Sequence, residues 1–276
     1  MRYRLRRVIN MAMLSSVTAC SILAVGLMFL IVGYIGIKGA GYVVKPSFYL
    51  HEPVPIGQTG GGISHAIVGT AILTTISAVI ALPLGIAAGV YLSEYAGRDR
   101  LVLRFIADTL TGVPSIVVGL FVYAFLVIHT GFSALSGGVA LAVIMLPIVT
   151  RTTEEALYLV PRDQREAALA LGSPKWRVVA GVVIPGASPT IVTGCLLATA
   201  RAAGETAPLI FTAFGNNFKS TDINGPVAAI PLVIFKYAQG PYKDQHDQAW
   251  AAAFVLVMLM LVLSALTRFA VSRRLK

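Results

Sequence analysis

Long runs without a charged residue alternate with short charged segments along this chain. Residues 11–37, 53–93, 109–150 and 248–267 each lack Asp, Glu, Lys and Arg. An α-helix rises 1.5 Å per residue and the hydrocarbon core of a bilayer is about 30 Å thick, so about 20 apolar residues complete one crossing. The runs 11–37 and 248–267 therefore predict one spanning helix each. The run 53–93 predicts a helix that begins after the glycines at 60–62.

Two segments are long enough for more than one crossing. As a single helix, residues 109–150 would be about 63 Å long, so this run must cross twice, with a turn near His129–Gly131. Residues 178–218 are interrupted only by Arg201 and Glu205 and fit one crossing or two.

The distribution of basic residues decides between these two options, because Lys and Arg collect on the cytoplasmic side of membrane proteins. A second crossing in 178–218 would place the basic C-terminus outside. One crossing, from about Ala187 to Phe214, gives six transmembrane helices with both termini in the cytoplasm. The cytoplasmic side then holds sixteen of the 22 basic residues: Arg2, Arg4, Arg6, Arg7, Arg98, Arg100, Arg104, Arg151, Arg162, Arg165, Lys175, Arg177, Arg268, Arg273, Arg274 and Lys276.

This topology divides the chain into a cytoplasmic basic tail at 1–10, a first transmembrane helix at 11–37 and a helical membrane domain at 63–270. The last of these contains a cytoplasmic loop at 151–185. Apolar residues make up 57% of the chain and charged residues 12%, a balance typical of an all-α polytopic membrane protein. The net charge of +10 is explained by membrane orientation, so we expect no nucleic-acid partner.

Sequence motifs for catalysis are missing. No G-x-x-x-x-G-K-[ST] phosphate-binding loop occurs, so any ATP chemistry belongs to another chain and we expect no enzyme activity in this one. The four histidines map to the outer side without the short spacing of metal ligands. The sequence therefore predicts neither a metal site nor a cofactor.

The loop 151–185 carries a short amphipathic helix. Asp163 stands three residues before Glu166, which predicts a capping box and a helix that starts at about residue 164 and breaks at Gly172 and Pro174. Basic residues surround a small apolar face, which fits a knob that docks into a groove of a partner protein. The alternative is a helix that lies on anionic lipid. The apolar face comprises Ala167, Ala168, Leu171 and Trp176.

A second constellation lies inside the fifth predicted span. A charged residue in a membrane is costly, so Arg201 is a functional candidate, with Glu205 one turn further on the same helix face. Pro208 frees the carbonyl of Gly204 and loosens the helix at this pair. The two charges either form an ion pair that makes the span insertable, or supply an anion site in which the planar fork of Arg binds an oxyanion.

Small and polar residues recur at helical spacing in the third predicted span, at Thr111, Ser115 and Gly119 beside Pro114. This stripe indicates either a wall of the same path or close helix packing.

The loop also resembles a known family. From Glu166-Ala167-Ala168 the pattern continues with three residues, Gly172, nine residues and Val182-Val183-Ile184-Pro185, and it resembles the coupling loop of type I ABC importer permeases. More narrowly, the run 200–209 and the segments 61–70, 91–95 and 112–120 resemble the PstA-type permeases of phosphate importers. The resemblance implies a MetI-like five-helix core, ATPase coupling through the loop, and a role of Arg201 and Glu205 in phosphate passage.

The resemblance further implies partners and a location. These are a homologous permease (PstC), a dimer of the ATPase (PstB), an external phosphate-binding protein (PstS), phosphate and the lipid of a bacterial cytoplasmic membrane. Two other functions stay open. One is an ABC permease for sulfate, molybdate or a phosphonate, and the other is a secondary transporter, for which a docking knob would have no use.

Overall fold

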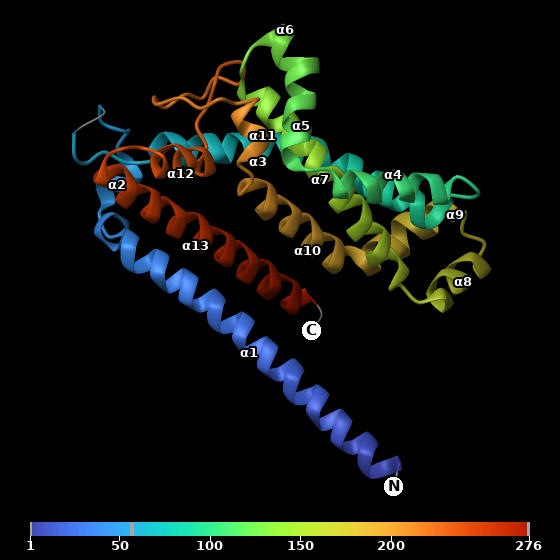
Figure 1. Cartoon of the computed structure of the whole chain (residues 1–276). Coiled ribbons are helices and arrows are strands. Elements are labelled where there is room, and N and C mark those ends of the chain that lie inside the picture. The colour runs from blue at the N-terminus through green and yellow to red at the C-terminus, as the bar shows by residue number, and fades with distance from the viewer. Residues whose placement is uncertain (1, 56–57, 275–276) are drawn as a thin grey trace.

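The computed structural model describes residues 2–55 and 58–274; Met1 and Lys276, which the basic tails include, lie outside this range. The described residues form helices and loops, with an isolated β-bridge between Phe214 and Val227 (Figure 1). The first half of the chain contains α1 (Arg2–Val43), α2 (Pro46–Leu50), α3 (Ser64–Val90), the π-helical turn η1 (Tyr91–Tyr95), α4 (Arg100–Gly112), α5 (Ser115–Val122), the π-helical turn η2 (Tyr123–Val127) and α6 (Ile128–Thr130).

The second half continues with a further series of helices, which forms the loop at 151–185, the next span and the segments that follow it. They are α7 (Ala134–Tyr158), α8 (Arg162–Ala170), α9 (Lys175–Val178), the π-helical turn η3 (Val179–Val183), α10 (Ile184–Ala203), α11 (Ala207–Ile210), α12 (Ile230–Ala238) and α13 (Lys243–Arg274).

The helices α3 and α7 form the centre of the bundle and run in parallel. A Cβ added at Gly85 would lie 2.8 Å from the Cβ of Val149, and one added at Gly89 would lie 2.6 Å from the Cβ of Thr153. Both contacts join residues that are 64 positions apart. A constant separation of this kind arises when two helices run in the same direction. The absence of side chains at these glycines lets the two backbones approach closely, as is common between membrane helices.

Because α3 and α7 are parallel, the chain between them must return to the side on which α3 began. It does so through α4 and α5, which meet at an angle of 99° across a two-residue break. Gly131, with φ of 83°, ends α6, and the Oγ of Ser133 accepts a hydrogen bond from the N–H of Ser136 at the start of α7. The predicted turn at His129–Gly131 is thus confirmed.

Five helices among the described residues are long and apolar enough to cross a membrane, and the bent pair α4–α5 makes a sixth. The predicted six-span, all-α fold is therefore confirmed when this broken span is counted once. The five are Tyr3–Val43, Ser64–Tyr95, Ala134–Tyr158, Lys175–Ala203 and Lys243–Ala265.

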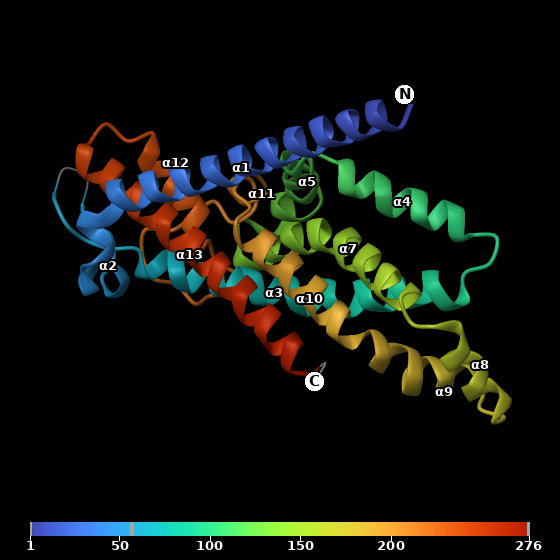
Figure 2. The same cartoon turned by 90° about the horizontal axis from the view of Figure 1, so that it is seen from below.

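The helix α1 packs against the last helix, α13, in antiparallel register (Figures 1 and 2). A Cβ added at Gly39 would lie 2.7 Å from the Cα of Ala251, and one at Gly36 would lie 3.0 Å from Phe254. Tyr34 meets Trp250 edge to face, with ring centroids 5.5 Å apart. The N-terminal part of α1 extends beyond the bundle in Figure 1.

The helices differ from the predicted spans at four ends. α1 continues on both sides of 11–37, because no Gly–Pro or capping signal separates the basic tail from the span. The fifth span begins at Lys175 rather than Ala187, since η3 carries the helix through Pro185. It ends at Ala203 rather than Phe214, and α11 follows as a separate turn.

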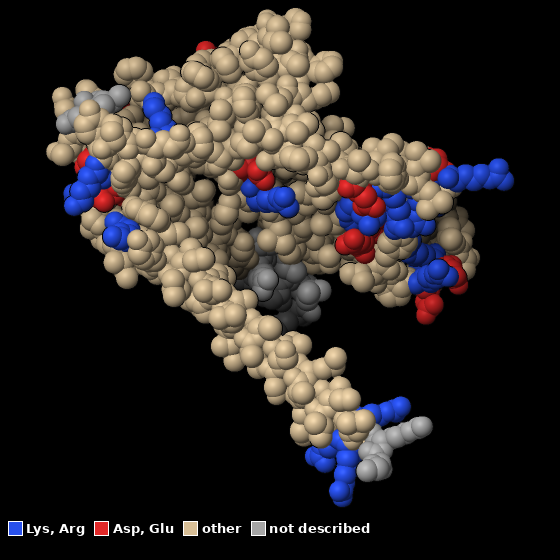
Figure 3. All heavy atoms as spheres, in the orientation of Figure 1, with Lys and Arg blue, Asp and Glu red and all other residues tan. Residues whose placement is uncertain are grey.

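The charged side chains gather at the ends of the molecule. Figure 3 shows Lys and Arg over the start of α1, and charges of both signs around α4 and α8, with a surface between them that is largely uncharged apart from one small patch of both signs. This pattern fits an apolar band in contact with lipid.

Candidate functional site

The four side chains assigned to the substrate path from sequence line one cavity of about 220 Å³. Thr111 comes from the end of α4, Ser115 from the start of α5, Arg201 from the last turn of α10, and Glu205 from the segment after it. The remaining wall is mainly apolar: Leu110, Val113, Pro114, Val118, Ile144 and Ile148.

The break between α4 and α5 is what directs polar groups into this cavity. Pro114 lacks an N–H and forces Val113 into an extended conformation, with φ of −68° and ψ of 128°. α5 then restarts at Ser115, so the first N–H groups of a new helix lie at the cavity wall. Such groups have no acceptor inside their own helix and favour a negative charge nearby.

The charged pair lies at the end of α10. Arg201 Nε is 3.7 Å from Glu205 Oε1, and the Arg201 side chain is 62% exposed in the single chain, whereas that of Glu205 is 19% exposed. The neighbouring Gly204 contacts Met260, within the uncharged run of α13. The charged pair therefore lies beside the apolar part of α13, as expected for charges inside a membrane.

The predicted stripe does not lie on one helix, because the chain bends at Pro114. Thr111 and Ser115 both reach the cavity, but Gly119 contacts the backbone of Pro208 instead. Close helix packing therefore explains the glycine at position 119, whereas Thr111 and Ser115 remain candidates for the substrate path. Thr111 Oγ1 donates to the carbonyl of Ala107 at 2.9 Å, which leaves its lone pairs as acceptors.

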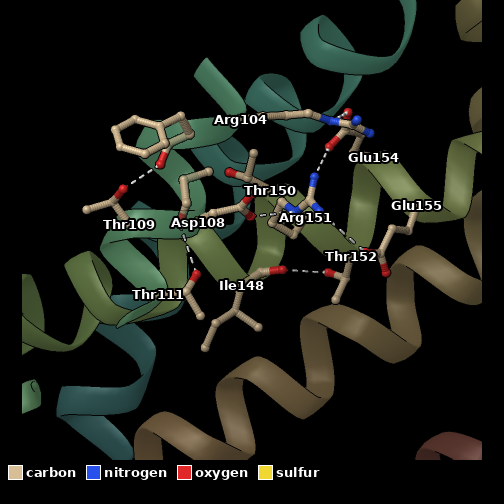
Figure 4. Close-up of polar contacts among 12 residues, drawn as sticks. Arg104, Asp108, Thr109, Thr111, Ile148, Thr150, Arg151, Thr152, Glu154 and Glu155 are labelled. Atoms are coloured by element: carbon tan, nitrogen blue, oxygen red, sulfur yellow. Dashed lines mark hydrogen bonds and ion pairs between the residues drawn. The ribbon is translucent and has the colours of Figure 1, made fainter. Parts of the chain in front are cut away.

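A second charged cluster, which the sequence analysis missed, lies nearby on α7 (Figure 4). The carboxylate of Glu154 is fully buried, with Arg104 Nε 2.8 Å from its Oε1 and Arg151 Nη1 2.7 Å from its Oε2. Arg151 also lies 3.1 Å from Asp108 on α4. Arg100 and Arg104 stand one turn apart, as do Arg151 and Glu154, and that spacing was the available signal. The cluster ties α4 to α7.

The coupling loop forms the predicted short helix, but its predicted cap was wrong. Pro161 is the N-cap residue of α8 and no side chain caps the helix, so Asp163 and Glu166 form no capping box. The reason is that Pro161 already has the extended conformation that precedes a helix. The helix therefore starts at Arg162, two residues earlier than predicted, and Asp163 lies inside it. Gly172 follows the helix with φ of 78°, which confirms the predicted break.

The tip of the loop carries exposed apolar side chains. Leu171 is 87% exposed and Trp176 is 60% exposed, and Glu166 and Ala167 are exposed as well. Ala168 instead is half-buried and packs against the core cluster. The expected apolar face thus divides into an inner side at Ala168 and a free tip at Leu171.

No group of three or more His, Cys, Asp or Glu side chains that could hold a metal ion occurs in the described part of the chain. The chemistry of the cavity is that of one guanidinium, one carboxylate and two hydroxyls.

Comparison with known proteins gives a consistent family. Residues 81–276 match the model of the family "Binding-protein-dependent transport system inner membrane component". The phosphate transport system permease protein PstA of Xylella fastidiosa is 45% identical over 266 residues, covering 95% of this chain and 92% of that protein. The protein of the same name from Yersinia pestis is 46% identical over 223 residues, covering 80% and 76%.

Solved structures share the fold at low sequence identity. A bacterial ABC transporter involved in the import of the acidic polysaccharide alginate aligns with a TM-score of 0.63 at 16% identity, over 99% of this chain and all of that one. The MetNI methionine ABC transporter in an inward-facing conformation aligns with a TM-score of 0.58 at 20% identity, over 76% and 93%.

Proposed function

Because the chain belongs to the family of binding-protein-dependent transport system inner membrane components, we propose that it is the permease subunit of an ABC importer that carries inorganic phosphate. The cargo is the one named for relatives at 45% and 46% identity. As a multi-pass inner-membrane permease it is not an enzyme, and ATP hydrolysis belongs to a partner chain. The family also argues against a secondary transporter.

The observation that carries the proposal is the incomplete pairing of Arg201. Within the described residues its one ion pair is the one with Glu205, with Nε 3.7 Å from Oε1, and neither Nη group makes a hydrogen bond. Arg104 and Arg151, by contrast, are engaged by the buried Glu154 at 2.8 and 2.7 Å. The guanidinium of Arg201 therefore keeps the planar fork that binds two oxygens of a tetrahedral oxyanion.

The rest of the cavity suits a protonated oxyanion. The hydroxyl of Ser115 and the start of α5 add donors to the cavity that Arg201 lines. Glu205 would repel a fully ionised anion, but phosphate carries at least one proton at neutral pH and donates it to the carboxylate. Sulfate has no such proton, so Glu205 disfavours sulfate.

The coupling role rests on the exposed tip of α8. An apolar side chain as open as Leu171, at the end of a loop ringed by basic residues, fits a groove on an ATPase subunit. We place Glu166, Ala167, Ala168, Leu171 and Gly172 at that contact. The full assembly would comprise a PstC-type permease, a PstB-type ATPase dimer and a PstS-type binding protein, with both termini of this chain in the cytoplasm.

Three variants of the reconstituted complex test the phosphate path. Arg201→Gln should assemble and lose phosphate uptake, because the fork is gone and Glu205 stands unpaired in the path. Glu205→Gln should keep measurable phosphate uptake and admit more sulfate. Arg98→Gln, which removes an exposed Arg from the turn after η1, is the matched control and should transport normally.

The double variant Arg201→Gln/Glu205→Gln separates transport from mere insertion. If the pair only neutralises itself in the membrane, both single variants should misassemble, and the neutral double variant should recover assembly and uptake. Near-normal uptake by the double variant would remove Arg201 from the substrate path. Equal transport of sulfate and phosphate by the unmodified complex would favour the other oxyanion importers.

A further inference from the structure

The segment Tyr91–Tyr95, which the substrate path does not use, holds a buried acid next to the coupling loop. The side chain of Glu94 is 7% exposed and lies in η1, at the end of α3. Its Oε1 lies 2.5 Å from Nη1 of Arg165, in the middle of α8, and also accepts from Ser93 Oγ at 3.0 Å. A buried charge is kept only with close partners, so Arg165 and Glu94 depend on each other.

Further contacts hold the loop at the same place. Arg165 uses Nη2 to donate to the carbonyl of Leu157 near the end of α7, at 2.5 Å. Lys175, at the start of α9, donates through Nζ to the backbone carbonyl of Glu94 and lies over the ring of Tyr95, 4.9 Å from its centroid. The two arms of the coupling loop, α8 and α9, are thus both fastened at η1.

The tip between the two arms has no such attachment. Leu169, Leu171 and Gly172 are all exposed. The loop therefore has an exposed tip and a base, which is the set of contacts at η1. The base joins α3 and α7, and those helices pack closely through Gly85 and Gly89. Farther along, α7 carries Ile144 and Ile148, which line the cavity of Arg201. A continuous set of contacts therefore leads from the tip to the cavity.

We propose that Glu94 is a positioning residue that locks the coupling loop to α3 and α7, so that movement of the ATPase moves these helices instead of bending the loop. This inference rests on the proposed function, because it requires the loop to dock on an ATPase. If the Glu94 contact served folding alone, its loss would lower assembly and stability. If the contact transmits movement of the ATPase, its loss lowers the amount of phosphate imported per ATP hydrolysed.

The test uses the complete importer in liposomes, with ATP hydrolysis and phosphate uptake measured on the same sample. Glu94→Gln keeps the shape of the side chain and removes its charge. We expect the ATPase to co-purify and hydrolyse ATP, while phosphate imported per ATP falls about tenfold. Asp99→Asn is the matched control, because this exposed acid accepts hydrogen bonds from Tyr91, at the start of η1, and from the N–H of Gly97, and from neither arm of the loop.

A second variant decides the case if Glu94→Gln does not assemble. Arg165→Lys keeps the charge but cannot hold Glu94 and the Leu157 carbonyl together, because an ammonium lacks the fork of a guanidinium. Its ratio of phosphate to ATP should also fall, by less than for Glu94→Gln. A normal ratio in Arg165→Lys or in an assembled Glu94→Gln overturns the proposal.

A third variant keeps this outcome distinct from failure of the proposed function. Leu171→Ser removes the apolar side chain at the tip and leaves Glu94 and Arg165 in place. If the ATPase still co-purifies fully with Leu171→Ser, the loop is not its docking site and the proposed coupling fails. If Leu171→Ser loses the ATPase while Glu94→Gln keeps a normal ratio, coupling stands and only the role of Glu94 is wrong.

Discussion

Gly119 lies against Pro208 so closely that an added Cβ would be 2.7 Å from the Cα of the proline and 3.1 Å from its carbonyl oxygen. The contact joins α5 to α11, and these are the elements that follow the two breaks at the cavity. Because the neighbour is backbone, it cannot rotate away as a side chain would. The position of Ser115 relative to Glu205 therefore depends on this glycine.

Gly119→Ala should separate α5 from α11, with a cost of about 1–3 kcal/mol, and lower phosphate uptake. Melting temperature in detergent and uptake in liposomes measure the two effects. Gly26→Ala makes the same substitution on α1, where a Cβ meets nothing within 4 Å, and should change neither. An unchanged melting temperature in Gly119→Ala would contradict this prediction, because it would show that α11 can move away from α5 at no cost in stability.

The tip of the coupling loop gives a second prediction. Leu171→Ser should weaken ATPase binding by about 2 kcal/mol, roughly 30-fold, because an apolar anchor is lost. Gly172→Val should do so as well, since a φ of 78° strains any β-branched residue. Co-purification of the ATPase is the measurement. Leu50→Ser, at a 74% exposed position at the end of α2, is the control and should leave binding intact.

The buried carboxylate of Glu154 gives a third prediction. Glu154→Gln removes the buried carboxylate that Arg104 and Arg151 share, while Arg151 keeps Asp108 at 3.1 Å. The substitution should destabilise the chain by about 2 kcal/mol, less than for fully buried pairs because both arginines are partly exposed. Thermal unfolding in detergent measures this. Glu155→Gln, at a 67% exposed neighbour, should fall within about 0.5 kcal/mol of the unmodified chain. Equal melting temperatures for the two variants would contradict the assigned role of the cluster.

Orientation is open to a direct test by cysteine labelling. In a background with Cys20→Ser and Cys195→Ser, a cysteine at Ala170 should escape a membrane-impermeant reagent in intact cells and react after permeabilisation. A cysteine at His129, beside the turn before α7, should react from outside in both cases. Reaction at position 170 in intact cells would reverse the proposed topology.

The spans were predictable because their cause is local: a bilayer selects about 20 uncharged residues, whatever the rest of the chain does. The helix ends were less so. Ala187 and Phe214 were expected to bound the fifth span, yet the helix runs from Lys175 to Ala203. Hydropathy detects contact with lipid, whereas the end at Ala203 reflects the packing of Gly204 on Met260 and of Pro208 on Gly119.

The candidate site was only partly predictable for a related reason. Arg201 stands out in sequence as a charge in an apolar run, but only the fold shows that Thr111 and Ser115, about 90 residues earlier, line the same cavity. Glu154 stayed hidden because it sits just past an apolar run, where a charge is usual. Its burial depends on Arg104, which arrives from another helix.

The pairing of α1 with α13 has a consequence for biosynthesis. Among the described helices, α1 is made earliest and α13 latest, and the two pack together through Gly39 and Ala251. Roughly 200 residues separate the two helices, so at about 5–20 residues per second α1 resides in the bilayer for about 10 to 40 s before its neighbour is made. Its run of uncharged residues, 11–37, allows it to stay there alone, and the contact between α1 and α13 forms only after α13 has been made.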